Sequence, residues 1–521
     1  MRAFTGMLFW IMVAVAAFHA AYASGKTSFL ITFYLFALLQ LARADRWRKA
    51  FYSGLTVGLL IAVVRLQFLW RIFSGGAFAL WLVYAFWIGL FVALARLCLV
   101  RLGPRWGWLL IPFVWTGLEY FRSELYYLRF SWLNAGYAFV GAPWQAALRL
   151  TGVYGIGFVL ISLAAGAAYL WQKSRTRSLG LLLLGVGGIC TVGLLSSREP
   201  SSQSLSGVRV AGVQMEFPTE REVLLRLNDL VRLYPHTDLV VLSEYTFGEP
   251  VPRAVRDWCR KNRRYLVVGG KDPAPGGNFY DTAYVVGPGG DIVFHQAKAV
   301  PIQFFKDGLP ATEQKAWDSP WGKVGICVCY DLSYTRVTDQ LVRLGAEALI
   351  VPTMDVADWG SAQHELHARI APARATEYGL PIFRIASSGI SQLVDRVGRV
   401  RATAPCPGDG AALAGTLQLR GPGSRPPDRW LAPAAVGVTA LLIILFPMRS
   451  NGNQPARSVW SAPYSGAFGR LRLRGRSREG NSAGIRRTPN ASRRRLPRGP
   501  SRLASHLAPR VAESLPWHSS P

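Results

Sequence analysis

The chain has 521 residues, of which 50% are hydrophobic and only 17% are charged. A soluble protein of this length would have roughly a quarter of its residues charged. The low charged fraction, together with apolar runs of membrane-spanning length, excludes a purely cytosolic enzyme. The 59 basic residues outnumber the 30 acidic ones and give a formal net charge of +29.

Eight apolar runs predict a membrane domain of about seven spans over residues 1–200 and a last span at 430–448. The runs are 4–23, 28–42, 51–70, 76–100, 106–121, 150–171, 178–197 and 430–448. Two of them, 28–42 and 106–121, are short for a hydrocarbon core about 30 Å thick, so an interfacial or re-entrant segment is an open alternative there. The first run also resembles a secretory signal peptide, because it ends in the cleavage-like triplet Ala21-Tyr22-Ala23.

Basic residues follow every second apolar run and set the expected orientation. They are Arg43, Arg46, Arg48, Lys49, Arg101, Arg105, Lys173, Arg175 and Arg177, together with the Arg-rich end of the chain. By the positive-inside rule these segments are cytoplasmic. Both termini then lie inside, and the long segment between the seventh and eighth runs lies on the opposite side. Cleavage after the first run would not change this orientation.

Residues 207–420 are the stretch long enough for an independently folded domain. Short β-rich runs alternate there with helical patterns. We expect strands at 208–215, 239–242, 265–269, 282–287, 324–329, 348–352 and 382–386, and helices at 220–233, 334–344 and 363–378. This order predicts an α/β domain with a mainly parallel or mixed sheet covered by helices.

Three polar or reactive residues lie where strand-like apolar runs end: Glu244 follows 239–242, Lys298 closes 292–297 and Cys329 ends 325–328. Each has an ordinary structural interpretation, because a lone Cys is usually buried core and Glu and Lys are usually solvated. However, α/β enzymes place their chemistry at the carboxyl ends of strands. We therefore expect the three side chains to meet in one site.

A Glu, a Lys and a Cys together support acyl transfer through a thioester. Glu244, with a pKa raised by burial, would take the proton of the thiol. Lys298 would favour the thiolate and the oxyanion, and the N–H of Tyr330 would point at the same oxyanion. The N-terminus of the helix that follows would add to this effect. Cys327 is a rival nucleophile, and we prefer Cys329 because it lies at the turn before Tyr330-Asp331.

An apolar cluster follows Lys298 and contains Ile302, Phe304 and Phe305. One interpretation is a packed core loop, since Phe is usually buried. The other is a lid at the membrane surface that opens to admit a lipid tail, with Phe304 and Phe305 in contact with the substrate.

The remaining segments predict few further sites. Residues 449–521 carry 15 Arg, no Lys and two acidic residues without apolar periodicity, which predicts a basic, disordered tail. Six scattered cysteines are too few for a disulfide framework, and none has a zinc-site spacing. We predict no cofactor, no structural metal and no nucleic-acid partner.

Three motifs in order resemble the carbon–nitrogen hydrolase (nitrilase) superfamily. They are Val240-Val241-Leu242-Ser243-Glu244, Phe294-His295-Gln296-Ala297-Lys298 and Gly325-Ile326-Cys327-Val328-Cys329-Tyr330-Asp331. The membrane part adds Glu119-Tyr120-Phe121-Arg122, Phe130-Ser131-Trp132-Leu133 and Leu150-Thr151-Gly152-Val153-Tyr154-Gly155. With these, residues 1–448 resemble the apolipoprotein N-acyltransferases, membrane enzymes that add the third acyl chain to bacterial lipoproteins. We expect Trp132 to contact the substrate.

The resemblance implies a Glu244–Lys298–Cys329 triad in a four-layer αββα domain that faces the periplasm from the inner membrane. It also implies a phospholipid acyl donor and a diacylated lipoprotein acceptor. Two departures concern the acceptor. The family's supporting Glu after the Lys motif is missing, with Asp307 as the nearest substitute, and Asp331 stands where the family has Glu. A membrane-anchored amidohydrolase, an acyltransferase with another acceptor, and a non-catalytic lipid-binding protein remain alternatives.

Overall fold

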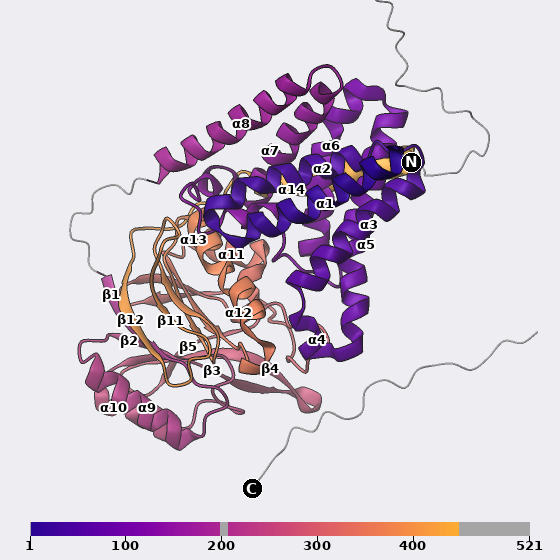
Figure 1. Ribbon diagram of the computed structural model, residues 1–521. Helices are drawn as coiled ribbons and strands as arrows, with labels where there is room; N and C mark the ends of the chain where they lie inside the picture. The colour runs from indigo at the N-terminus through magenta and orange to yellow at the C-terminus, as the bar shows by residue number, and fades with distance from the viewer. Residues whose placement is uncertain (1, 198–206, 447–521) are drawn as a thin grey trace, which may run out of the picture. The chain divides into compact units, whose positions relative to one another are not determined.

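The computed structural model describes residues 2–197 and 207–446. The predicted tail at 449–521 lies outside these ranges. All eight apolar runs form helices (Figure 1). The helices are α1 (Arg2–Ala23), η1 (Gly25–Leu30), α2 (Ile31–Leu41), α3 (Trp47–Arg65), α4 (Phe68–Phe73), η2 (Ser74–Gly76), α5 (Ala77–Arg101), α6 (Gly103–Tyr120), η3 (Phe121–Leu125), η4 (Ala135–Phe139), α7 (Ala147–Trp171), α8 (Arg175–Ser196) and α14 (Asp428–Leu445).

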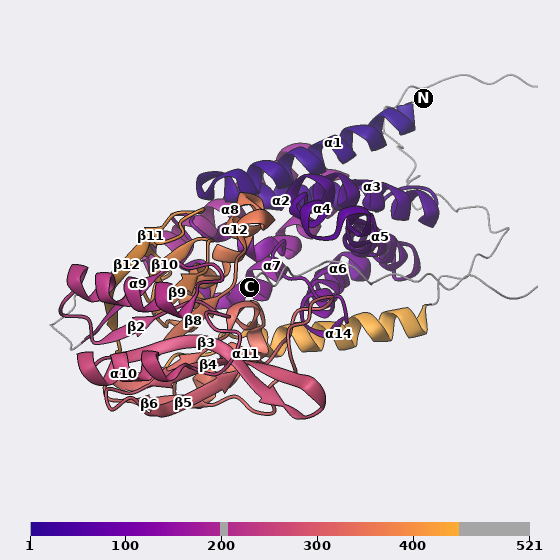
Figure 2. The ribbon, with the colours of Figure 1, turned by 90° about the horizontal axis from the view of Figure 1, so that it is seen from below.

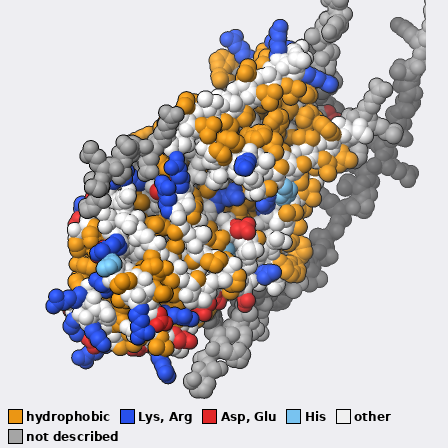
Figure 3. All heavy atoms as spheres, turned by 60° about the vertical axis from the view of Figure 1, so that its left-hand side comes forward, with side chains coloured by type: hydrophobic (Ala, Val, Ile, Leu, Met, Phe, Trp, Pro, Cys, Tyr) orange, Lys and Arg blue, Asp and Glu red, His pale blue; other side chains and the backbone are white. Residues whose placement is uncertain are grey.

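Six described helical segments are long and apolar enough to cross a membrane. They are Thr5–Ala23, Trp47–Arg65, Phe68–Arg101, Ala147–Trp171, Arg175–Leu195 and Asp428–Leu445. The two short runs are the exceptions: Gly25–Leu41 is apolar but shorter, and α6, which contains Pro112, is not among the six. Hydrophobic side chains cover broad areas of the surface over the helices (Figure 3), as expected where a protein meets lipid.

Two six-stranded mixed sheets form the centre of the second domain. The first has the order β12-β1-β2-β3-β4-β5 and the second β11-β10-β9-β8-β7-β6. The strands are β1 (Gly207–Val213), β2 (Leu239–Val241), β3 (Tyr265–Ala274), β4 (Asn278–Val286), β5 (Ile292–Ala297), β6 (Ala316–Ser319), β7 (Gly322–Ile326), β8 (Ala348–Thr353), β9 (Ile382–Ala386), β10 (Ser391–Val394), β11 (Val400–Ala404) and β12 (Ala412–Gln418).

Helices cover the outer face of each sheet. They are α9 (Glu220–Leu233) and α10 (Arg253–Asn262) on the first, and α11 (Thr335–Arg343), α12 (Ser361–Ala368) and α13 (Ile370–Tyr378) beside the second. Figures 1 and 2 show α9 and α10 on the side of the sheets away from α11 and α13. The expected αββα class is confirmed.

The sequence of β2 shows why its sheet is covered on both faces. Val240 and Leu242 pack in one core with α9 and α10, whereas Leu239 and Val241 belong to the core shared with the second sheet. Because successive side chains of a strand point to opposite faces, a strand buried on both faces is a continuous apolar run.

Two details of the predicted elements are wrong. The helix expected at 363–378 is broken at Arg369 into α12 and α13. Pro372 lacks an N–H and cannot bond to the carbonyl of Ala368, so the helical hydrogen bonding is interrupted at Arg369, although this residue keeps helical dihedral angles. The strand expected at 324–329 ends at Ile326. Sequence patterns also missed α10, β6, β10, β11 and β12.

Helix α7 is interrupted at Gly152, whose φ of 78° is in the left-handed region. The helix begins again with N–H groups that have no carbonyl partner, and acidic side chains accept from them. Val153 N donates to Glu377 Oε1 of α13 at 2.7 Å, and Tyr154 N donates to Asp428 Oδ2 of α14 at 2.9 Å. Carboxylates at a helix N-terminus satisfy free donors and the helix dipole. This capping joins the membrane helices to the second domain.

Candidate active site

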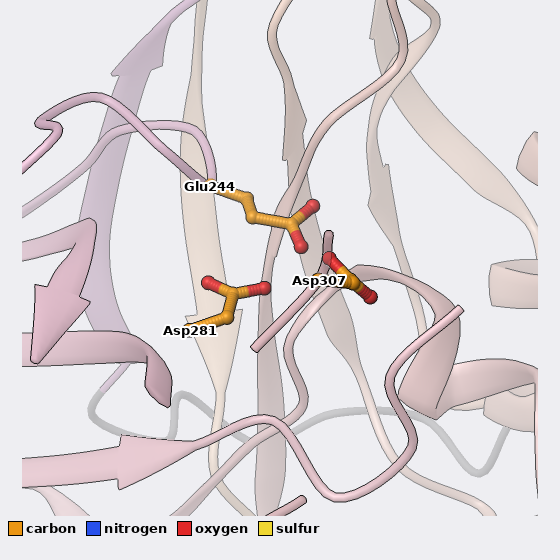
Figure 4. Close-up of side chains that lie close together, drawn as sticks. All are labelled: Glu244, Asp281 and Asp307. Atoms are coloured by element: carbon orange, nitrogen blue, oxygen red, sulfur yellow. The ribbon is translucent and has the colours of Figure 1, made fainter. Parts of the chain in front are cut away.

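Glu244 and Lys298 meet in a buried charge cluster between the two sheets. Lys298 Nζ lies 2.7 Å from Glu244 Oε1, 2.8 Å from Asp307 Oδ2 and 3.3 Å from Asp281 Oδ2. Figure 4 shows the three carboxylates converging, and their oxygens lie within 4.8 Å of one another. Such a set could ligate a cation. Because Lys298 Nζ is in contact with all three, its ammonium group supplies the positive charge.

Glu244 and Lys298 stay charged in this cluster although both side chains are buried. Burial pushes the pKa of Glu244 upward, but the charge of Lys298 and hydrogen bonds lower it below its ordinary value. Burial pushes the pKa of Lys298 downward, but Asp307 and Glu244 raise it well above its ordinary value. The expectation that burial would raise the pKa of Glu244 is therefore wrong, because the ion pair outweighs desolvation. Burial and Glu244 raise the pKa of Asp281 and favour its neutral form.

Cys329 follows β7 and begins the short 3-10 helix η6 (Cys329–Ser333). Its φ of 51° is uncommon for a residue with a side chain and marks a strained turn. The thiol donates to Met354 O at 3.6 Å, and Met354 N donates to Glu244 Oε2 at 2.6 Å. The α-helix expected at 334–344 begins at Thr335, and η6 lies between its N-terminus and the thiol.

The two cysteines differ in what they face. Cys329 lines a cavity, and burial together with Glu244 raises the pKa of its thiol. The resting thiol is therefore neutral and lies beside an ionised carboxylate that can accept its proton. Cys327 is buried, and its N–H donates to Ile350 O at 3.1 Å, which continues the pairing of β7 with β8.

Asp331 fastens the loop after Lys298 to the turn that carries Cys329. Its carboxylate accepts hydrogen bonds from Ala299 N at 3.0 Å, Val300 N at 2.8 Å and Val328 N at 3.3 Å. Burial raises the pKa of Asp331 to about 6, although these N–H groups and Lys298 act in the opposite direction. Asp331 thus supports the position of both catalytic candidates from outside the cavity.

Asp307 also lies in the site, as the sequence suggested. Besides contacting Lys298, it accepts from Tyr245 OH at 2.9 Å and from Ile302 N at 2.6 Å. Tyr245 has a φ of 50°, the second strained backbone position of the site. Asp307 therefore ties the segment after Lys298 to the charge cluster.

An apolar cavity opens beside Cys329, and most of its wall comes from the membrane part. The lining residues are Leu66, Phe68, Leu69, Ile72, Phe73, Leu80, Val83, Tyr84, Trp87, Arg122, Leu128, Arg129, Phe130, Trp132, Ile302, Gln303, Phe304, Phe305, Cys329, Tyr330, Met354, Trp359, Gln363 and His367. Trp132 is buried and its indole N–H donates to Ser333 Oγ at 3.1 Å. The ring of Trp132 lies 5.8 Å from that of Tyr330.

Phe304 and Phe305 do not form a packed core loop. Their exposed fractions are 64% and 40%, which contradicts the core interpretation. Both rings contact Phe73 of α4, with centroids 5.8 and 5.7 Å apart, and Phe305 also contacts Trp359. These aromatic side chains form the outer rim of the cavity.

Sequence reasoning missed Asp281, Asp355 and His367. His367 lines the cavity, and its Nδ1 lies 2.7 Å from Asp355 Oδ1. Asp355 also accepts from Arg384 Nη2 at 2.5 Å. Glu244 was singled out because it lies just after a strand. The same criterion would have found Asp355, because Asp355 lies two residues after the end of β8.

Both parts of the chain are similar in sequence to known proteins. Residues 5–166 match the family model described as apolipoprotein N-acyltransferase N-terminal domain, and residues 209–414 match the model described as carbon-nitrogen hydrolase. A relative named apolipoprotein N-acyltransferase from Shewanella oneidensis is 27% identical over 423 residues, 70% of this chain and 78% of the relative. One of the same name from Geobacter metallireducens is 25% identical over 425 residues, 71% and 81% of the two chains.

A solved nitrilase-superfamily protein from Saccharomyces cerevisiae has a TM-score of 0.36 and 18% identity, covering 48% of this chain and 99% of its own. The two family models follow one another along the chain and together cover most of it. The chain belongs to the apolipoprotein N-acyltransferase family, and its catalytic domain to the carbon–nitrogen hydrolase superfamily.

Proposed function

We propose that this protein transfers an acyl chain from a phospholipid, through a thioester on Cys329, to the N-terminal amine of a diacylated lipoprotein. One observation carries the proposal. Cys329 lies where a buried charge cluster from the catalytic domain meets an apolar cavity whose wall comes mostly from the membrane part. This arrangement brings a nucleophile to a lipid chain without moving the chain into water.

The first half-reaction forms the thioester. Glu244 takes the proton of Cys329, and the sulfur attacks the ester carbonyl of the donor. Lys298 and the N–H of Tyr330 stabilise the oxyanion of the tetrahedral intermediate. When the C–O bond breaks, the leaving lysophospholipid oxygen takes the proton from Glu244.

The second half-reaction releases the acyl chain to the acceptor. The amine nitrogen attacks the thioester carbonyl, the same groups stabilise the oxyanion, and the C–S bond breaks. The sulfur leaves as a thiol after receiving a proton through Glu244. The product is an amide on the lipoprotein, and the site returns to its starting charge state.

Two guanidinium groups in the cavity support a phospholipid as the donor. Arg122 is only 5% exposed, and its Nη2 donates to Asn134 Oδ1 at 2.5 Å. Arg122 Nη1 and Arg129 Nε are buried without a hydrogen-bond partner, and neither residue forms a salt bridge within the described part of the chain. Buried cationic donors in an apolar cavity fit the phosphate of a lipid headgroup.

We place the protein in the bacterial inner membrane with the catalytic domain in the periplasm. Six apolar helices support a membrane protein, and the alternation of basic loops supports this orientation. A lipoprotein acceptor and a phospholipid donor would both reach the cavity from the outer leaflet.

The proposal is tested by mass spectrometry of lipoprotein N-termini from cells with and without this protein. We expect triacylated N-termini when it is present and diacylated N-termini with a free amine when it is absent. Unchanged N-termini in the two strains would overturn the lipoprotein acceptor. They would favour a membrane-anchored amidohydrolase or an acyltransferase for another amine.

A further inference from the structure

We infer that His367, held by Asp355, is a second base of this site. Its Nε2 takes the proton that the acceptor's ammonium group must lose before the nitrogen can attack the Cys329 thioester. The inference rests on the proposed function and adds the group that prepares the acceptor.

Counting protons shows why one base is not sufficient. The α-amino group of an acceptor has a pKa of about 8, so at neutral pH it arrives as an ammonium ion. It loses one proton before attack and a second when the C–N bond has formed and the C–S bond breaks. The second proton returns to the sulfur of Cys329, whereas the first must leave the site.

Glu244 is engaged in the second of these transfers. Its Oε1 is paired with Lys298 at 2.7 Å and its Oε2 accepts from Met354 N at 2.6 Å. A carboxylate that returns a proton to sulfur cannot at the same time hold the proton of the ammonium group. A second base in the cavity must therefore take the first proton of the ammonium group.

The contacts of His367 fix which of its nitrogens carries a proton. Nδ1 lies 2.7 Å from Asp355 Oδ1, and an ionised carboxylate only accepts hydrogen bonds. Although burial pushes the pKa of Asp355 upward, His367 and Arg384 hold it well below its ordinary value. Nδ1 therefore donates its proton to Asp355, and Nε2 keeps its lone pair.

The position of the ring is fixed by packing. His367 is only 3% exposed and is stacked on Trp132, with ring centroids 5.0 Å apart and planes 16° apart. Its ring also lies edge-to-face with that of Tyr330, with centroids 6.4 Å apart, and it lines the cavity that contains Cys329. Since Nδ1 is bound to Asp355, Nε2 is the nitrogen that can reach a molecule in the cavity.

The charges around His367 keep it neutral before the acceptor arrives. Burial lowers the pKa of His367, and Arg384, whose Nη2 lies 3.2 Å from Nδ1, acts in the same direction. Asp355 and Glu244 act in the opposite direction without reversing the shift. A neutral imidazole next to a carboxylate can accept a proton, because Asp355 stabilises the imidazolium that results.

The test separates the two half-reactions in the full-length protein. The thioester is first formed with a phospholipid and measured by intact mass. Transfer to a synthetic diacylated lipopeptide with a free N-terminal amine is then followed in a single turnover between pH 6.5 and 9.5. The variants are His367→Gln and His367→Asn. His364→Gln is the matched control, because His364 lies on the same helix and its Nε2 contacts Val356 O instead of the cavity.

We expect His367→Gln to form the thioester at the wild-type rate and to transfer it about 10-fold more slowly at pH 7, because only about a tenth of an amine with a pKa of about 8 is neutral there without a base. The defect should shrink towards pH 9.5, where the acceptor amine is already neutral. Hydroxylamine, which is neutral at pH 7, should release the acyl chain from variant and wild type at equal rates. The control variant should follow the wild type throughout.

Other results overturn the inference. His367 would have a structural role if the variants lost the same fraction of the transfer rate at every pH, or lost as much rate with hydroxylamine. The same conclusion would follow from slower formation of the thioester, or if both His367 variants failed to fold. Transfer at the wild-type rate at pH 7 would exclude it from the reaction. If the wild-type protein forms no thioester, or passes no acyl chain to the lipopeptide, the proposed function itself fails, and this inference with it.

Discussion

Lys298 remains charged although its side chain is fully buried. The carboxyl groups of Glu244, Asp281 and Asp307 replace the water that an ammonium group would otherwise need. A buried charge without such partners would cost several kcal/mol, and removing one member of a buried ion pair typically costs about 3–5 kcal/mol. In the proposed mechanism this positive charge stabilises the oxyanion that forms beside Cys329.

Substitution of the two charged residues should affect different steps. Glu244→Gln keeps the shape of the side chain but removes the base, so formation of the thioester should slow by about 100-fold or more. Lys298→Met should slow both half-reactions, because the oxyanion forms in each. Single-turnover rates with phospholipid and with lipopeptide check both statements. A loss below about threefold in either variant would remove that residue from the mechanism.

The nucleophile is tested by a pair of alanine substitutions two residues apart. Cys329→Ala should form no acyl adduct and transfer no acyl chain, because it removes the sulfur that lines the cavity. Cys327→Ala is the matched control and should keep most activity, since Cys327 only packs in the core. Intact mass after incubation with phospholipid reports the adduct. An adduct on the Cys329→Ala protein would transfer the role to Cys327.

Residues that follow strands were predictable, whereas residues inside strands or helices were not. Glu244, Lys298 and Cys329 each end an apolar run, and the position alone suggested chemistry. Asp281 lies within β4, where a single acid among strand residues gives no such signal. His367 lies on α12 and becomes notable only through its contact with Asp355. Sequence spacing cannot show contacts between residues on different elements.

At the scale of elements, α4 and the segment after Lys298 together form the rim of the cavity. Phe73 of α4 contacts both Phe304 and Phe305, and α4 lies within the apolar segment Phe68–Arg101. Phe304 has a φ of 72°, a strained conformation in an exposed loop. We interpret the rim as a lid at the membrane surface that a lipid tail must pass.

Replacing Phe304 and Phe305 together by Ser should impair reaction with long-chain phospholipid far more than with a short, soluble thioester. The reason is that the exposed rings contact the lipid tail and contribute little to the core. Kinetics with the two donors and a thermal unfolding curve measure the effect. Leu225→Ser with Leu233→Ser is the matched control, because both are exposed apolar residues on α9. Early unfolding with a parallel loss of both activities would rule out the lid.

The predicted bounds of an element agree with the observed ones where the sequence has a strong local signal, such as a helix cap. The helix at 220–233 was predicted at its observed bounds, and its N-cap, Thr219, forms a capping box with Glu222. The break at Arg369 was missed because the apolar pattern continues through it, although Pro372 was visible in the sequence. Strands β10 and β11 have four and five residues, too few to establish a period.

At the scale of the whole molecule, the alternation of basic loops predicts the side on which the catalytic domain lies. A membrane-impermeant thiol reagent should label Arg260→Cys from the periplasm, whereas Arg46→Cys and Arg175→Cys should react only after the membrane is opened. The unsubstituted protein controls for native cysteines. Protection of position 260 in intact spheroplasts would invert the orientation and exclude a periplasmic acceptor.

The carboxylates that cap the restart of α7 are supplied late in synthesis. Glu377 lies 224 residues after Val153, and Asp428 lies 274 residues after Tyr154. The translocon therefore receives α7 long before the ribosome has made either cap. Until then the N–H groups beyond Gly152 lack these two acceptors, and an unpaired backbone group in a lipid environment costs several kcal/mol. Assembly of the membrane helices is consequently not finished when they are inserted. It ends only when the catalytic domain has folded and α14 has entered the bilayer.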